Sequence, residues 1–139
     1  MGRICKTFVI LLLVTFPLNV YSQTVIVNSD NEITSLSKST LKAIFSMRLR
    51  TWPDGTPITV FIQNRDSQIH QKFCLSKLEI LPYQIQRTWD VLVFSGTGQS
   101  PIELNSESEI KQKIGRIKGA IGYVLEIEGA GDVKSISVH

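Results

Sequence analysis

The sequence contains few of the residues that carry out acid–base or covalent catalysis. It has two histidines, His70 and His139, and two cysteines, Cys5 and Cys74. No Gly-x-Ser-x-Gly elbow and no His-Glu-x-x-His motif occurs. His70 and Cys74 would share one face of a helix, but no third group that would orient such a dyad is evident, and Phe73 places that face near the core. We therefore expect neither an enzyme nor a metal or cofactor site.

The first 22 residues have the three parts of a cleavable export signal. Two basic residues precede an apolar run over 8–16, and Val20 and Ser22 stand where a signal peptidase reads small side chains. The apolar run is shorter than the roughly 20 residues that a membrane-spanning helix needs. We expect a signal peptide over 1–22, a periplasmic mature chain over 23–139, and no membrane span after cleavage.

Removal of this signal would leave little excess charge and one cysteine. The mature chain would carry 13 Lys and Arg against 12 Asp and Glu, a net charge of +1. No basic stripe would remain to neutralise a row of phosphates, so we expect no nucleic-acid partner. Cys74 would be alone, which excludes an internal disulfide and fits export to a bacterial periplasm. Its apolar helical surroundings favour a buried, inert thiol.

The chain beyond the signal predicts one α/β domain. Dense apolar and β-branched residues predict strands over 24–28, 58–62, 120–125 and 133–138. Helices are predicted to follow the N-caps Ser37, Ser67 and Ser106, and to begin at Pro82. Because helices alternate with strands, we expect a small, mainly parallel or mixed sheet flanked by helices.

Apolar residues in the predicted helices recur at the spacing of a buried face. The side chains expected in the core are Leu41, Ile44, Phe45, Ile69, Phe73, Leu78, Ile85, Trp89, Leu92, Val93, Ile110, Ile114 and Ile117. Trp89 is also a candidate binding platform, although an aromatic residue at this spacing is more often part of the core. On the exposed side of the last helix we expect the ion pairs Glu107–Lys111 and Glu109–Lys113.

The strongest candidate for a binding site is the segment Asn64-Arg65-Asp66-Ser67, between a strand and a helix. This order places a guanidinium, a hydroxyl and the unpaired N–H groups of a helix's first turn at one point. Amides, helix dipole and an Arg fork together suit phosphate or carboxylate. We expect an oxyanion site formed by Arg65, Ser67 and the amides of Gln68 and Ile69. The alternative is that Ser67 only caps the helix and Arg65 is solvated.

A Gly-rich turn, Ser95-Gly96-Thr97-Gly98, is a candidate supplement to that site. It is not a P-loop, because no Gly-Lys-Ser/Thr follows and the glycine spacing differs. Its backbone has the composition of a second anion nest. A plain surface turn is the alternative interpretation.

Short motifs follow one another in a fixed order between Val25 and Val124. They are Leu36-Ser37 through Leu41, Ala43-Ile44-Phe45, Trp52-x-Asp54-Gly55, the strand over 58–62, Arg65-Asp66-Ser67 through Phe73, Trp89, Gly96-x-Gly98 and Gly119-Ala120-Ile121-Gly122-Tyr123-Val124. In this order they resemble the PstS-like phosphate-binding proteins that serve ABC transporters, a branch of the type 2 periplasmic binding proteins. The resemblance implies a single-lobe form of that fold, since full-length members are about twice this size and close two lobes over the anion.

The resemblance also bears on the candidate site. In that family, an Arg followed by Asp-Gly-Ser-Gly-Thr at a helix start holds phosphate. The resemblance matches Arg65 and Ser67 with the family's Arg and Ser, with two residues missing between them, and puts Gln68 and Ile69 where Gly and Thr would stand. Half a site, open to water, would hold an oxyanion weakly, because it neither desolvates the ligand nor completes its hydrogen bonds.

Two functions are therefore expected from the sequence. The first is an exported solute-binding protein that takes phosphate or a similar oxyanion and is linked to ABC-type phosphate transport through a membrane permease. The second is a periplasmic interaction module that retains the fold without transport. In the second case an apolar face, once covered by the missing lobe, would meet another periplasmic protein or a second copy of the chain.

Overall fold

The computed structural model describes residues 15, 22–129 and 131–139 of the chain. The expected signal peptide over 1–22 lies outside the described residues except at positions 15 and 22. Within the described part, no helix combines the length and the apolar character that a membrane crossing requires.

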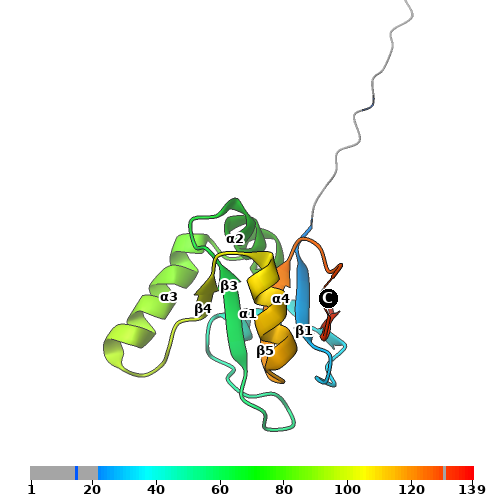
Figure 1. Cartoon of the computed structure of the whole chain (residues 1–139). Helices are drawn as coiled ribbons and strands as arrows, with labels where there is room; N and C mark the ends of the chain where they lie inside the picture. Colours follow the sequence, from blue (N-terminus) through cyan, green and yellow to red (C-terminus); the bar gives the residue numbers. More distant parts are fainter. Residues whose placement is uncertain (1–14, 16–21, 130) are drawn as a thin grey trace, which may run out of the picture.

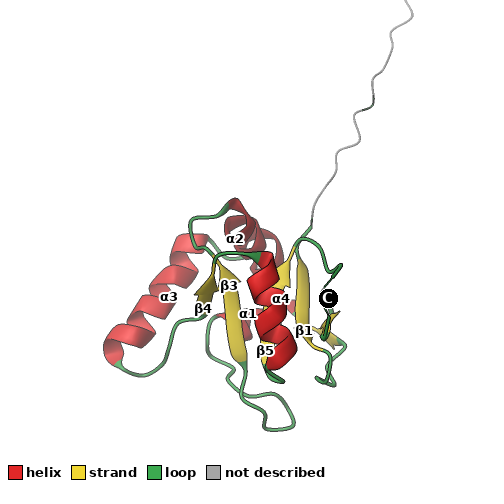
Figure 2. Ribbon diagram, in the orientation of Figure 1, coloured by secondary structure: helices red, strands yellow, loops and turns green. Residues whose placement is uncertain are grey.

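A five-stranded sheet with the order β4-β3-β5-β1-β6 forms the centre of the domain. Its strands are β1 (Thr24–Asn28), β3 (Thr59–Gln63), β4 (Ile102–Leu104), β5 (Ala120–Val124) and β6 (Val133–Ser135). β3 pairs in parallel with β4 and β5, whereas β1 pairs antiparallel with β5 and β6. Helices flank this mixed sheet (Figure 1, Figure 2). The α/β fold class predicted from the sequence is confirmed.

A second, two-stranded sheet pairs β2 (Ser35–Leu36) in parallel with β7 (Ser137–Val138). The single strand predicted over 133–138 is therefore wrong, because the chain changes sheets at Ile136. The side chain of Ile136 is buried in the core, and its backbone N–H donates to the carbonyl of Val25 at 3.0 Å. The residues on either side of Ile136 consequently pair with different partner strands.

The helices are α1 (Lys38–Phe45), α2 (Gln68–Phe73), α3 (Pro82–Ser95) and α4 (Glu107–Arg116), with a π-helical turn η1 (Cys74–Leu78) after α2. Ser37, Ser67 and Ser106 are confirmed as N-caps, because each hydroxyl accepts a hydrogen bond from the amide three residues further on. Pro82 opens α3 as expected. The helix after Ser67 is not uniform, and its π-helical turn ends at Glu79 in the left-handed region, with φ of 52°.

Two apolar clusters hold the helices on the sheet. One cluster joins α1, α2 and α3 around Phe45, Phe73 and Trp89, and the other joins α4 to the sheet through Ile110 and Ile114. The prediction that Val93 belongs to the core is wrong, since 52% of its surface is exposed. The last turn of α3 is open to solvent, because Phe94 and Ser95 beside Val93 are exposed as well.

The Gly119-Ala120-Ile121-Gly122 motif is explained by two close approaches. A Cβ on Gly119 would lie 1.9 Å from the carbonyl oxygen of Pro57, and one on Gly122 would lie 2.8 Å from the Cδ1 atom of Ile114. The bare backbone at Gly119 also lets the indole of Trp52 donate to its carbonyl at 3.0 Å. These two glycines therefore bring the loop before β3 and helix α4 into contact with β5.

Candidate functional site

The candidate site lies where parallel strands end. β3, β4 and β5 run in the same direction, so their carboxyl ends meet at one edge of the sheet. The loop after β3 leads into α2, and the loop after β4 leads into α4, which brings two helix starts to this edge. In open α/β sheets, ligands bind outside the carboxyl ends of the strands.

The loop that contains Arg65 is closed by hydrogen bonds of its own. The amide of Asp66 donates to the side-chain oxygen of Asn64 at 2.9 Å, and the amide of Ser67 donates to its carbonyl at 2.9 Å. The Ser67 hydroxyl donates to that same carbonyl at 2.6 Å while it accepts from the amide of His70 at 3.2 Å. Both roles of this hydroxyl are therefore taken up inside the loop.

Gln68 and Ile69 are the first two residues of α2, so their N–H groups have no partner inside the helix. Among the described residues outside α2, none accepts a hydrogen bond from them. α2 has only six residues, which limits the charge that its dipole places at this end. The predicted role of these amides in anion binding stays a prediction.

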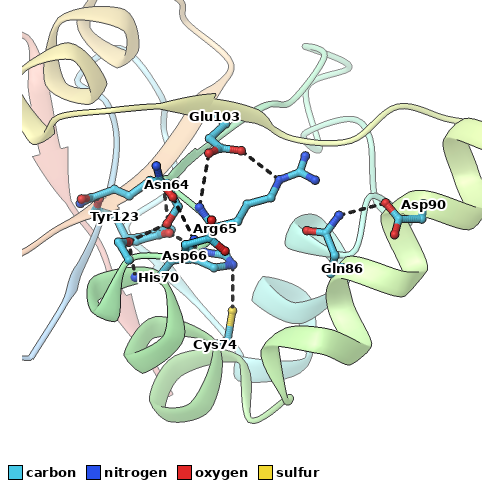
Figure 3. Close-up of polar contacts among 11 residues, drawn as sticks. Asn64, Arg65, Asp66, His70, Cys74, Gln86, Asp90, Glu103 and Tyr123 are labelled. Atoms are coloured by element: carbon cyan, nitrogen blue, oxygen red, sulfur yellow. Dashed lines mark hydrogen bonds and ion pairs between the residues drawn. The ribbon is translucent and has the colours of Figure 1, made fainter.

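The Arg65 side chain runs toward Glu103 and α3, away from the start of α2 (Figure 3). Its Nε lies 3.0 Å from Oε2 of Glu103, but Nε is buried and makes no hydrogen bond, so the contact is an ion pair with poor alignment. The Arg65 amide donates to Oε1 of the same carboxylate at 3.4 Å, and its guanidinium carbon lies 5.5 Å from the centre of the Trp89 ring. Arg65 is thus anchored by a carboxylate and an aromatic face.

A hollow of about 230 Å³ opens beside this guanidinium. It is lined by Arg65, Asp66, His70, Gln71, Pro82, Tyr83 and Gln86. Neither Nη atom of Arg65 makes a hydrogen bond to a described residue, which leaves both nitrogens available to a ligand. The neighbouring carboxylates of Asp66 and Glu103 offset the single positive charge of Arg65, so the hollow does not strongly attract an anion.

A second carboxylate of the protein occupies the start of α4. The Oε1 atom of Glu107 accepts a short hydrogen bond from the amide of Leu125 and a longer one, at 3.4 Å, from the side chain of Gln63. The ion pair predicted between Glu107 and Lys111 is therefore wrong, because Glu107 turns inward while Lys111 donates to the carbonyl of Glu128. The predicted ion pair between Glu109 and Lys113 is also not formed. The ion pairs found among the described residues are Lys38–Glu79, Arg65–Glu103 and Lys118–Asp54.

His70, which lines the hollow, belongs to a buried chain of polar groups. The Tyr123 hydroxyl accepts from the amide of Gln63 at 3.1 Å and lies 2.7 Å from Nδ1 of His70, whose Nε2 is 3.5 Å from the sulfur of Cys74. Since the Tyr123 oxygen already accepts one hydrogen bond, its own proton is best placed by donation to Nδ1. This assignment puts the imidazole proton on Nε2, which faces Cys74.

This chain of groups does not form an activated nucleophile. Burial raises the pKa of the Cys74 thiol to about 12, and it also raises the pKa of Tyr123. Burial, with the nearby Arg65 charge as a second cause, lowers the pKa of His70. The three groups are therefore neutral near pH 7. The contact of Tyr123 with His70 could not be predicted from the sequence, because the two residues are 53 positions apart.

The Ser95–Gly98 turn lies near the start of β3, at the opposite end of this strand from Arg65. It lines a hollow of about 400 Å³ with Ile58, just before β3 begins, whereas Arg65 follows the end of β3. The amides of Gly96, Thr97 and Gly98 already donate to carbonyls in the last turn of α3. The structure thus does not bring this turn together with Arg65. The N–H groups of these three amides are already used and are not free to bind an anion.

Comparison with known proteins places this geometry in a family. Residues 20–131 match the family model described as a PBP superfamily domain. No curated protein matches the chain. Three similar solved structures are an ABC-type phosphate transport receptor from Vibrio cholerae, a putative phosphate ABC transporter substrate-binding protein with bound phosphate from Clostridium perfringens, and PstS from Borrelia burgdorferi.

These similarities concern the fold. Identities are 17%, 16% and 17%, and the TM-scores are 0.57, 0.58 and 0.62, in that order. The alignments cover 84%, 84% and 85% of this chain, but only 45%, 44% and 47% of the solved chains. The chain therefore spans less than half the length of the structures it matches, in agreement with the single-lobe form that the sequence predicted. With most of its length matched by the family model, the chain belongs to the PBP superfamily domain family.

Proposed function

We propose that this chain is an exported, periplasmic interaction module that keeps one lobe of the phosphate-receptor fold and acts through the outer side of α3. The observation that carries the proposal is the apolar surface of that helix. Tyr83, Val91 and Phe94 are 66%, 59% and 90% exposed. Apolar side chains that lie exposed on the outer side of one helix, two of them lining a shared groove, favour a site where proteins meet.

The polar edge of the sheet supports the same conclusion. Glu103 is paired with Arg65, and Glu107 accepts the amide of Leu125 and the side chain of Gln63. The protein's own carboxylates thus take donors that an external anion would need. A lobe of this kind is poorly suited to act alone as a high-affinity phosphate receptor.

A second candidate function is weak binding of phosphate or a similar oxyanion, linked to ABC-type transport through a permease. The specific observation in its favour is that Arg65 lines a hollow of about 230 Å³ and that neither of its Nη atoms has a hydrogen-bond partner among the described residues. One of the similar structures holds bound phosphate. In this case Arg65 would be the main ligand of the anion, because its side chain runs away from Ser67 and from the amides of Gln68 and Ile69, and the Ser67 hydroxyl is already hydrogen-bonded inside its own loop.

Calorimetric titration of the mature protein with phosphate and with sulfate separates the two functions. The interaction module predicts no heat of binding up to millimolar anion. The receptor function predicts heat at micromolar phosphate that disappears in Arg65→Ala. Lys72→Ala is the matched control, since Lys72 is an exposed cation near the end of α2.

A further inference from the structure

The outer side of α3 carries a seam of side chains at the spacing of a helix-packing interface. Tyr83, Arg87, Asp90 and Phe94 follow one another at intervals of four, three and four residues. At about 100° per residue these positions fall on one narrow face of the helix. Ile85 and Trp89, which are fully buried, fall on the opposite side.

This seam is open to solvent. Tyr83, Arg87, Asp90 and Phe94 are all exposed, and Figure 1 shows α3 along one side of the molecule. Arg87 takes part in none of the ion pairs found among the described residues. Within the described part of the chain, the Asp90 carboxylate accepts a hydrogen bond only from the side-chain amide of Gln86, at 2.9 Å. Beside the seam runs a shallow groove of about 610 Å³ whose lining includes Ile80, Tyr83, Arg87 and Val91.

The order of residues in the seam is complementary to itself when reversed. If a second α3 packs antiparallel about a twofold axis between Thr88 and Trp89, Tyr83 of each copy meets Phe94 of the other. In the same register, Arg87 of each copy meets Asp90 of the other. A parallel pairing would instead place Arg87 on Arg87 and Asp90 on Asp90, which like-charge repulsion disfavours.

We infer that α3 is a self-association surface on which a second copy of this chain packs antiparallel. The inference rests on the proposed interaction function and names its partner. An isologous contact of this kind uses one patch on both copies, as a twofold dimer requires. Two aromatic contacts lie at its ends and two ion pairs lie at its centre. With its 14 residues, α3 is about 21 Å long, so the interface is small and the dimer exchanges with monomer.

The test is sedimentation velocity on the mature protein, from low micromolar to near-millimolar concentration, with a set of charge-exchange variants. Arg87→Asp and Asp90→Arg each put like charges together and are expected to weaken dimerisation at least about tenfold. The double variant R87D/D90R restores opposite charges across the axis and is expected to return to within about threefold of the original association. A different protein partner on this face would not be matched again by the exchange.

Phe94→Ser and Val93→Ser form a matched pair, because both side chains are exposed and apolar but only Phe94 lies in the seam. Phe94→Ser should abolish the concentration dependence, and Val93→Ser should leave it unchanged. All substituted residues are exposed, and circular dichroism checks that each variant is folded. A double exchange as weak as either single variant, equal effects of the two serine variants, or a monomer at every concentration overturns the inference.

The two failures are distinguishable. A protein that stays monomeric and gives no heat with phosphate overturns self-association only, and it leaves the proposed interaction function with another partner. Heat at micromolar phosphate that is lost in Arg65→Ala overturns the proposed function itself.

Discussion

His70 is the residue whose environment makes the clearest pH prediction. It is 2% exposed and hydrogen-bonded to Tyr123, and burial lowers its pKa below the ordinary value of 6.5. As pH falls through 6.5, the unfolded chain takes up a proton at His70 while the folded chain resists it. The free energy of unfolding should therefore fall between pH 7 and pH 5 and level off only below the folded pKa.

Urea unfolding at pH 7 and pH 5 measures this effect, with His70→Gln as the comparison. Glutamine keeps a hydrogen-bonding side chain but does not titrate, so the variant should lose most of the difference between the two pH values. It should also be less stable at pH 7, because it cannot reproduce both contacts of the imidazole. An unchanged pH dependence in His70→Gln would show that other groups cause it.

Glu103 controls what Arg65 can bind. Its carboxylate lies 3.0 Å from Nε of Arg65, so Glu103→Gln removes the charge that offsets the guanidinium while it preserves the side chain's size. If the hollow takes an oxyanion at all, this variant should bind phosphate about tenfold more tightly than the original protein. Calorimetry with phosphate measures the change, and Glu109→Gln serves as an exposed control at the start of α4. Equal affinities in both variants would exclude Arg65 as the anion ligand.

Individual residues differ in how far the sequence predicts them. Ser67 as an N-cap and Trp89 as a core residue were predictable, because each depends on neighbours within about one or two helical turns. Arg65 was placed correctly at the strand's end, but its partner Glu103 is 38 positions away. A contact at that separation is set by the pairing of β3 with β4, for which no local sequence signal exists.

At the scale of elements, the close packing of β5 predicts an ordered series of glycine variants. Gly119→Ala should destabilise the fold most, by about 3 kcal/mol or more, since its Cβ would meet the backbone oxygen of Pro57. Gly122→Ala should cost about 1–2 kcal/mol, because the nearest atom is the end of the Ile114 side chain.

Gly115→Ala is the control for this series. Gly115 lies inside α4, and its nearest neighbour would be 3.6 Å from the new Cβ, so alanine should be neutral or stabilise by up to about 1 kcal/mol. Thermal unfolding of the three variants gives the order. A Gly119→Ala protein as stable as Gly115→Ala would contradict the close approach of the two loops.

The strands show why part of the architecture was not predictable. The long apolar runs of β1, β3 and β5 stand out because all three are buried at the centre of the sheet. β2 and β4 have only two and three residues, too few for any periodicity to appear. The exchange of sheets at Ile136 depends on tertiary packing, so the sequence over 133–138 predicts one strand where the structure has two.

On the scale of the whole molecule, the similarity to solved structures concerns the fold alone. The chain aligns with less than half of each of the three structures, at TM-scores of 0.57, 0.58 and 0.62. At the carboxyl ends of the parallel strands, two of its own carboxylates contact N–H groups of the protein, and Phe94, the most exposed of the large apolar residues described, lies on α3. A family motif in the sequence could indicate the family, but the contacts that Glu103 and Glu107 make with residues distant in the chain are visible only in the structure.

Export gives the last prediction for the molecule as a whole. β1 begins at Thr24, and Gln23 is already buried at 3% exposure, so the folded domain starts immediately after the expected cleavage site. A signal peptidase would therefore have to cut after Ser22 before β1 joins the sheet, that is, during translocation of the unfolded chain.

The intact mass of protein recovered from a periplasmic fraction should correspond to residues 23–139. Val20→Arg, which places a bulky charge where the peptidase reads a small side chain, should leave the precursor uncleaved and membrane-associated. Recovery of unprocessed full-length chain from the cytoplasm would instead contradict export.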